Sequence, residues 1–272
     1  MQPPDSESGF TDVDRTADPA YYVRYLDAAR TLEAAAAYKR RSFDLLALQP
    51  GARVLEVGCG VGDDVLALAG LVGADGQAVG VDYSETLIAA ARERSAGSGL
   101  PVEFRVGDAE HLDLPDDSFD AARAERVFIH LADPARALAE MIRVTRRGGH
   151  VVLSEPDWET LIVDAPDRDV TRRLLHFGCD SLRQGWMGRR LYGLFHAAGL
   201  ADVGVEPGTG VVTDYELASK VFEFPKLAAA GRDAGIVTVA EAEAWLGGLE
   251  RAAAEGRFFC ALTGFIAHGR KP

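Results

Sequence analysis

Cysteines, long apolar runs and basic residues are all scarce in this sequence of 272 residues. The three cysteines, Cys59, Cys179 and Cys260, are odd in number and contain no C-x-x-C pair, so neither a disulfide framework nor a structural zinc site is predicted. No apolar run reaches the length of about 18 residues that spans a bilayer. The 29 basic residues are outnumbered by 42 acidic ones, and the resulting net charge of −13 disfavours binding to nucleic acid phosphates.

The first 18 residues are polar and acidic, and they contain proline. They therefore lack the basic start and apolar centre of a signal peptide. We expect a flexible N-terminus over residues 1–18 and a single domain over residues 19–272, since 47% of the chain is apolar and can form one sizeable core. The sequence predicts a cytoplasmic protein that binds neither membranes nor nucleic acid.

The central part of the chain alternates between strand-like and helix-like segments. Short apolar runs bounded by glycine or acidic residues are followed by alanine-rich stretches with helical spacing. This alternation predicts an α/β fold with a parallel sheet covered on both faces. The strand candidates are residues 53–57, 78–81, 102–106, 119–124 and 150–154, and the helix candidates are residues 63–71, 84–95 and 133–144.

The flanking segments are mostly helical in pattern. Residues 19–48 carry apolar side chains at helical spacing and predict one or two helices before the first strand. Residues 158–200 are largely helical, and two further strands are expected at residues 201–206 and 257–268. Because the segment 213–256 is too long for a plain connection, we expect it to form a helical cap over the binding face together with residues 158–200.

A glycine-rich loop follows the first strand. Gly58, Gly60 and Gly62 alternate before a helix that begins at Asp63, which allows the backbone to turn tightly and to approach a ligand. The second strand ends at Asp82, where a carboxylate can accept hydrogen bonds from both ribose hydroxyls. A nucleotide-like cofactor is therefore predicted, although a tight strand-to-helix turn without a ligand would also need glycines.

A nicotinamide dinucleotide also binds to a glycine loop with a later acid. Its pattern, G-x-G-x-x-G, would require glycine at position 63 if it began at Gly58, but the sequence has Asp63 there. The spacing here is G-x-G-x-G instead. This difference disfavours a nicotinamide-dependent oxidoreductase.

Residues 54–63 and Asp82, taken together with Gly107-Asp108-Ala109-Glu110 and the segment 114–120, resemble the class I S-adenosylmethionine-dependent methyltransferases. The likeness covers about residues 50–156 and is greatest to the small-molecule group that includes quinone C-methyltransferases. The resemblance implies a seven-stranded, mostly parallel, Rossmann-like sheet in the order 3-2-1-4-5-7-6. Its last strand, residues 258–267, would lie antiparallel beside the fifth, with N-terminal lid helices over residues 19–48.

The resemblance also assigns the contacts of S-adenosyl-L-methionine. The glycine loop would lie against the methionine part, Asp82 would bind the ribose, and Asp108 would bind the adenine amino group. Glu56 would support the loop and the cofactor's ammonium group. The implied cofactor-binding residues are Tyr22, Glu56, Gly58, Cys59, Gly60, Asp82, Tyr83, Asp108, Ala109 and Arg126.

The methyl acceptor would bind beyond strands four and five. His130 is a candidate base or a pocket-lining residue, and Glu155 and Asp157 could take a proton or stabilise positive charge, unless they belong to a solvated loop. No compact spacing of His and carboxylates predicts a metal. Arginines of the cap could recognise an acidic acceptor or could simply be exposed. The candidate acceptor-binding residues are Tyr21, His130, Trp158, Arg183 and Trp186.

The predicted function is methyl transfer to a small-molecule acceptor by in-line displacement, in specialised metabolism. Such a reaction depends on alignment and on exclusion of water, and it needs a base only if the attacking atom must lose a proton. Two alternatives use the same fold: a cofactor-retaining cyclase or rearrangement enzyme, and a noncatalytic binding protein. We expect a monomer or a homodimer.

Overall fold

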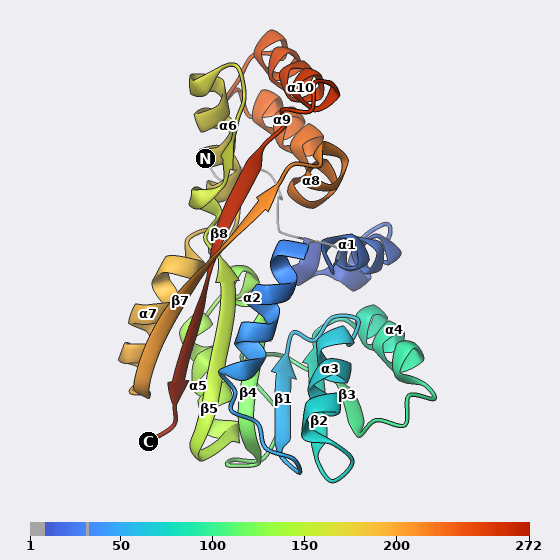
Figure 1. The fold of residues 1–272 in the computed structure, drawn as a ribbon, viewed down its shortest axis with the longest axis vertical. Coiled ribbons are helices and arrows are strands. Elements are labelled where there is room, and N and C mark those ends of the chain that lie inside the picture. Colours follow the sequence, from blue (N-terminus) through green and yellow to red (C-terminus); the bar gives the residue numbers. More distant parts are fainter. Residues whose placement is uncertain (1–8, 31–32) are drawn as a thin grey trace.

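The computed structural model describes residues 9–30 and 33–272. Its strands form a single eight-stranded sheet at the centre of the protein (Figure 1). The strands are β1 (Arg53–Val57), β2 (Gln77–Asp82), β3 (Val102–Val106), β4 (Phe119–Glu125), β5 (Thr145–Pro156), β6 (Ile162–Val163), β7 (Ala201–Val212) and β8 (Cys260–Arg270). They lie in the order β3-β2-β1-β4-β5-β8-β6, and β7 also pairs with β8.

The predicted α/β topology is confirmed, with one additional strand. β1 to β5 pair in parallel, and β8 runs antiparallel to β5, as the resemblance implies. β7 occupies the outer position expected for the sixth strand and pairs antiparallel with β8. The sheet has eight strands rather than seven because the two residues of β6 pair with Ala261 and Cys260 of β8.

Helices cover both faces of the sheet. Successive strand residues point to opposite faces, so Val54 packs against one helical layer and Leu55 against the other. In the described part of the chain, no helix is long and apolar enough to cross a membrane. One layer consists of α2 (Glu33–Asp44), α3 (Asp63–Val72) and α4 (Glu85–Ser95), and the other of α5 (Pro134–Val144) and α7 (Met187–Ala197).

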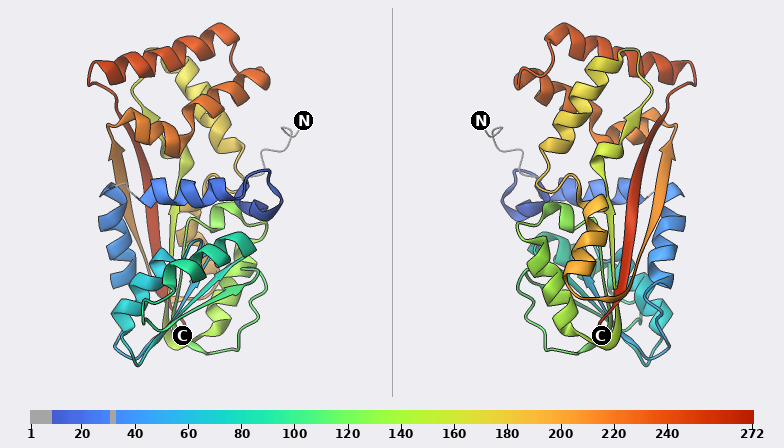
Figure 2. Two further views of the ribbon diagram at one scale, coloured as in Figure 1. Left: turned by 90° about the vertical axis from the view of Figure 1, so that its right-hand side faces the viewer. Right: turned by 90° about the vertical axis from the view of Figure 1, so that its left-hand side faces the viewer.

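A cap with its own core lies beyond the carboxyl ends of the parallel strands (Figures 1 and 2). Phe224 and Trp245 are buried at its centre, with ring centroids 5.7 Å apart in an edge-to-face arrangement. The predicted cap segment 158–200 divides, because the apolar side of α7 packs on the sheet instead. The cap helices are α6 (Arg168–Asp180), α8 (Tyr215–Phe222), α9 (Phe224–Asp233) and α10 (Val239–Ala254).

The N-terminal segment lies across the molecule between the sheet and the cap (Figure 2). Of the predicted flexible stretch 1–18, residues 1–8 lie outside the described residues, and residues 9–15 form two short 3-10 helices, η1 (Gly9–Thr11) and η2 (Val13–Arg15). Asp14 accepts hydrogen bonds from the backbone amides of Glu85 and Thr86, at 2.8 and 3.1 Å. These amides begin α4 and need an acceptor, which explains why this acidic segment is held in place before α1 (Ala20–Arg30).

Candidate active site

A cavity of about 840 Å³ lies at the carboxyl ends of β1, β2 and β4, between the sheet and the cap. One half is formed by the glycine loop and the residues after β2 and β3. The other half extends under the cap, where apolar side chains of α6, α8 and α9 line it. Most residues predicted to bind cofactor or acceptor share this cavity: Tyr21, Tyr22, Glu56, Gly58, Cys59, Gly60, Asp82, Tyr83, Asp108, Ala109, Arg126, His130, Trp158 and Arg183.

The glycine loop has a backbone that only glycine adopts without strain. Gly58 and Gly60 have φ angles of +68° and +52°, in the left-handed region. A Cβ atom on Gly58 would lie 2.2 Å from Cγ2 of Val127, so the neighbouring loop after β4 leaves no space for a side chain. The amide of Gly58 donates to the carbonyl of Val81 at 2.7 Å, which fixes the loop to the end of β2.

Asp82 connects this loop to the start of α4. One carboxylate oxygen accepts from the amide of Gly60 at 2.8 Å, and the other accepts from the amide of Ser84 at 3.0 Å. Burial raises the pKa of Asp82, while the two backbone hydrogen bonds oppose that change. Each carboxylate oxygen can accept a second hydrogen bond, so the side chain can hold its loop and a ribose at the same time.

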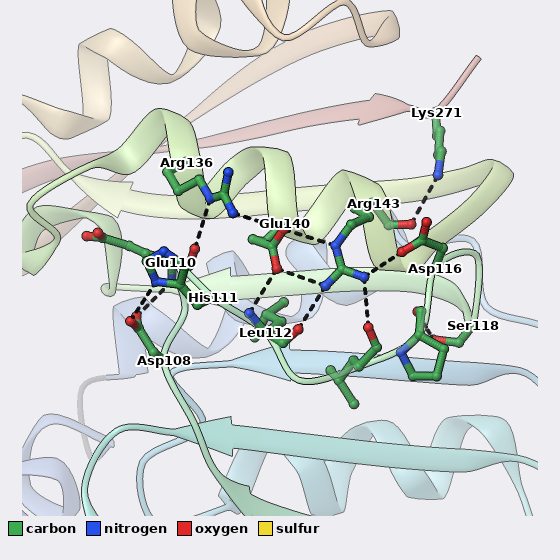
Figure 3. Close-up of polar contacts among 12 residues, drawn as sticks. Asp108, Glu110, His111, Leu112, Asp116, Ser118, Arg136, Glu140, Arg143 and Lys271 are labelled. Carbon is green, nitrogen blue, oxygen red and sulfur yellow. Dashed lines mark hydrogen bonds and ion pairs between the residues drawn. The ribbon is translucent and has the colours of Figure 1, made fainter.

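Asp108 is oriented by its own loop (Figure 3). The amide of Glu110 donates to one carboxylate oxygen at 2.8 Å, and Nδ1 of His111 lies 3.0 Å from the other. Glu110 in turn accepts from the amides of Ala132 and Asp133, both at 2.9 Å, at the start of α5. The loop that carries Asp108 is thereby joined to the segment after β4.

Two residues of α5 that are not among the predicted site residues also support this loop (Figure 3). Glu140 accepts from the amide of Leu112 at 2.9 Å, and Arg143 donates to the carbonyls of Leu112 and Leu114, both at 2.8 Å. The hydrogen bonds from Arg143 lower the pKa of Glu140. The spacing of three residues on a predicted helix is a signal that could have paired Glu140 with Arg143.

A buried ionic cluster lies beneath the glycine loop. Arg123 is fully buried and forms ion pairs with Glu56, Asp64 and Glu125, while Lys39 bonds to Asp64 at 2.8 Å. Of this group, only Glu56 is a predicted site residue. The cluster places three carboxylates beside two cations.

Glu56 is the member of this cluster that fits a ligand. Its Oε2 atom is buried and has no hydrogen-bond partner, and the residue lines the cavity. Burial raises the pKa of Glu56 to about 8, against the opposing charge of Arg123. A cationic group bound here would supply the missing hydrogen bond, and its charge would offset the cost of burying the carboxylate.

Aromatic residues of the N-terminal segment close the cavity from the side. The ring of Phe10 lies 4.9 Å from that of Tyr22 and 5.4 Å from that of His130. Tyr21 donates to Glu223 of the cap at 2.6 Å, and Tyr25 donates to the carbonyl of Val221 at 3.3 Å. Because these bonds join α1 to α8 and α9, the N-terminal segment and the cap together shield the cavity.

His130 ends the 3-10 helix η3 (Phe128–His130) and lines the cavity. Burial, together with the positive charges of Arg126 and Arg183, lowers the pKa of His130 to about 4. The imidazole is therefore neutral at pH 7 and is a weak base. This favours the pocket-lining interpretation over that of a general base.

Glu155, near the end of β5, and Asp157, just after it, do not line the cavity. Glu155 is fully buried and accepts from the amides of Val127 and Phe128, at 2.8 and 2.7 Å, because the first amides of η3 need an acceptor. Asp157 is also fully buried and forms an ion pair with Arg189. Both side chains thus stabilise the loops around the site. They do not belong to a solvated loop, because they are buried, and they do not line the cavity in which a catalytic group would act.

Trp186, a predicted acceptor-binding residue, also lies away from the cavity. Its side chain is exposed, and the guanidinium of Arg189 lies 5.0 Å from its ring centroid. The chain reverses after α6 so that Arg183 faces the cavity while Trp186 does not. Across residues 9–30 and 33–272, no group of three or more His, Cys, Asp or Glu side chains could hold a metal ion.

Comparison with known proteins identifies the family. The profile described as "Methyltransferase domain" matches residues 48–199, which contain the glycine loop, Asp82 and Asp108. The chain belongs to this methyltransferase family. Its cofactor is S-adenosyl-L-methionine. The residues present fit that molecule, because the positive-φ glycines, the carboxylate of Asp82 and the unpartnered oxygen of Glu56 all line one half of the cavity.

Two relatives differ in how much of the chain they cover. An uncharacterized 37.1 kDa protein in transposon TN4556 of Streptomyces fradiae is 39% identical, over 90% of this chain and 70% of its own length. A demethylmenaquinone methyltransferase of Bacillus cytotoxicus is 33% identical over 46% of this chain. The match spans about half of the Bacillus enzyme, 54% of its length.

Solved structures share the fold of this methyltransferase. A candidate methyltransferase of Bacillus halodurans superimposes with a TM-score of 0.62 at 20% identity, covering 86% of this chain and 98% of that one. The [4+2]-cyclase SpnF superimposes with a TM-score of 0.52 at 24% identity, covering 87% of this chain and 81% of that one. At these identities the likeness concerns the fold alone.

Proposed function

We propose that this methyltransferase transfers a methyl group from S-adenosyl-L-methionine to a small-molecule acceptor bound in the cap half of the cavity. The observation that carries the proposal is the continuity of the cavity, which joins the glycine loop to the apolar space under the cap. The cofactor supplies a methyl group on a positively charged sulfur, a good leaving group. The chain has to hold the two molecules in line and exclude water.

The described residues suit these tasks. Asp82, Asp108 and the amides of the glycine loop would bind and orient the cofactor. Phe10 and Tyr22 line the cavity with their rings in contact, and the bond from Tyr21 to Glu223 holds α1 against the cap. Because Glu155 and Asp157 lie outside the cavity, we assign them no proton transfer.

A calorimetric titration with S-adenosyl-L-methionine tests this proposal. Asp82→Ala should weaken binding by about 10- to 100-fold, because it removes a ribose acceptor and releases the amide of Gly60. Asp233→Ala is a matched control, since Asp233 is exposed at the end of α9 and outside the cavity. If the wild-type protein does not bind the cofactor, or if Asp82→Ala binds it as tightly as the control does, the proposal is refuted.

A cyclase that retains its cofactor is the second candidate function. It is favoured by the weak basicity of His130, which suits a reaction without proton removal, and the [4+2]-cyclase SpnF shows that the fold can accommodate such a function. Such an enzyme would bind S-adenosyl-L-methionine but release no S-adenosylhomocysteine during turnover, so mass spectrometry of the product mixture separates the two functions. A role in specialised metabolism, a location in the cytoplasm and a monomeric or homodimeric state all stay predictions.

A further inference from the structure

The cap half of the cavity is an apolar chamber with aromatic walls. Trp158 and Phe222 meet edge to face, with centroids 6.1 Å apart. Their rings offer flat surfaces of the kind on which another ring system packs. The apolar and aromatic residues of this chamber are Trp158, Leu161, Leu175, Phe177, Leu182, Phe222 and Leu227.

Two residues that line the cavity, Trp158 and Arg126, have side-chain hydrogen-bond donors without acceptors among the described residues. Nε1 of Trp158 is buried and has no hydrogen-bond partner. Within the described chain, the guanidinium of Arg126 makes no hydrogen bond to a side chain or carbonyl, and its ion pair with Glu125 is long, at 3.7 Å. An unpaired buried donor such as Nε1 of Trp158 is costly, and a ligand that brings an acceptor oxygen removes that cost.

Arg126 is held at this position by its backbone. Its φ angle is +57°, which is unfavourable for a residue with a side chain, and its amide donates to the carbonyl of Ser154 at 2.9 Å. The nearby carboxylate of Glu125 is already paired with Arg123 and Lys39. A strained residue whose charge is incompletely matched, on the wall of a cavity, points to a ligand.

The acidic side chain of this half of the cavity is already occupied. Glu223 accepts from Tyr21 at 2.6 Å and lies 3.4 Å from Nζ of Lys226. Arg126 and Arg183 also line the cavity. Both add to the effect of burial in lowering the pKa of His130, so their positive charges act on the same part of the wall.

We propose that the acceptor is an aromatic oxyacid, a flat apolar ring system whose anionic oxygen binds to the guanidinium of Arg126 and whose second oxygen accepts from the indole of Trp158. This inference rests on the proposed function and specifies its substrate class. The ring packs between the aromatic walls, and the ion pair with Arg126 is strengthened by the exclusion of water.

Binding of 2-naphthoate and of its uncharged analogue 2-acetylnaphthalene, measured by calorimetry on protein saturated with S-adenosylhomocysteine, tests the inference. The wild-type protein should bind 2-naphthoate about 10- to 100-fold more tightly than the ketone. Arg126→Met should abolish this preference, whereas Trp158→Phe should weaken both probes, since it removes the indole donor and keeps a ring. Arg105→Met is the matched control, because Arg105 lies on edge strand β3, pairs with Glu103 and is outside the cavity.

Each contrary result has a distinct meaning. If the wild-type protein fails to bind 2-naphthoate at about 1 mM, or binds both probes equally, the oxyacid proposal is overturned while methyl transfer still stands. If Arg126→Met retains the preference, Arg126 is not the anion site and the proposal is again overturned. If Arg126→Met loses S-adenosylhomocysteine instead, Arg126 belongs to the cofactor half. Failure of the wild-type protein to bind S-adenosylhomocysteine contradicts the proposed function itself.

Discussion

Replacing Arg123 by methionine should destabilise the protein strongly. Arg123 has no exposed surface, pairs with Glu56, Asp64 and Glu125, and donates to Oγ of Ser42 at 2.9 Å. Methionine keeps much of the volume but leaves buried carboxylates without their cation. Removing one partner of a buried ion pair costs about 3 to 5 kcal/mol. For a protein of this size, a loss of about 4 kcal/mol lowers Tm by roughly 8 to 16 °C.

The loss should depend on pH in a defined direction. Although burial acts to raise it, the pKa of Asp64 is lowered by Arg123 and Lys39, whereas burial raises the pKa of Glu56 to about 8. Without Arg123, the folded-state pKa of each carboxyl group rises, so the variant loses stability as the pH rises above about 4.5. The difference from wild type should therefore be larger at pH 8 than at pH 5.5.

Urea unfolding at both pH values measures this difference. Arg105→Met is the control, and it should change the free energy of unfolding by less than about 0.5 kcal/mol because Arg105 is exposed. A loss below about 1 kcal/mol for Arg123→Met, or an equal loss at the two pH values, would refute the assignment of Arg123 as the centre of a buried ionic cluster.

Two further predictions concern the cavity walls. The folded pKa of His130 is about 4, so its contribution to stability is present above pH 6.5 and is lost as the pH falls towards 4. Urea unfolding at pH 7.5 and at pH 4.5 measures this effect. Between these two pH values, the free energy of unfolding of the wild-type protein should fall by about 2 kcal/mol more than that of His130→Gln. Gly58→Ala should weaken cofactor binding by more than about 10-fold in calorimetry, because the new Cβ meets Val127. The control is Gly70→Ala in α3, where a new Cβ meets nothing within 4 Å. This control should bind the cofactor normally, and its free energy of unfolding should rise by about 0.5 to 1 kcal/mol.

The cofactor half could be predicted because its determinants are local in the chain. Gly58, Gly60 and Gly62 adopt positive φ angles at alternate positions, and Asp82 is the last residue of β2. The order of the strands came from the family resemblance, and the short strand β6 was missed because two residues carry no periodic pattern.

The rest of the site depends on partners far apart in sequence. Arg123 stands 67 residues from Glu56 and 81 from Ser42, so no local pattern predicts their contact. Glu155 belongs to an acidic run that is typical of a solvated loop. Its side chain is nevertheless buried, because it accepts the hydrogen bonds of the first amides of η3. A side chain that accepts hydrogen bonds from backbone groups far away in the sequence leaves no local pattern, so its role cannot be predicted from the sequence.

Strand β8 helps to set the distance between the two ends of the cavity. Its residues from Gly264 to Arg270 pair with β5, while Cys260 and Ala261 pair with β6 in the cap. A strand rises about 3.4 Å per residue, and an insertion of two residues keeps every side chain on its own face. Lengthening β7 and β8 by two residues each would therefore extend this connection to the cap by about 7 Å. The segment 157–167 and the bonds from Tyr21 and Tyr25 would have to shift with it, so the length of the cavity is set jointly by these three connections.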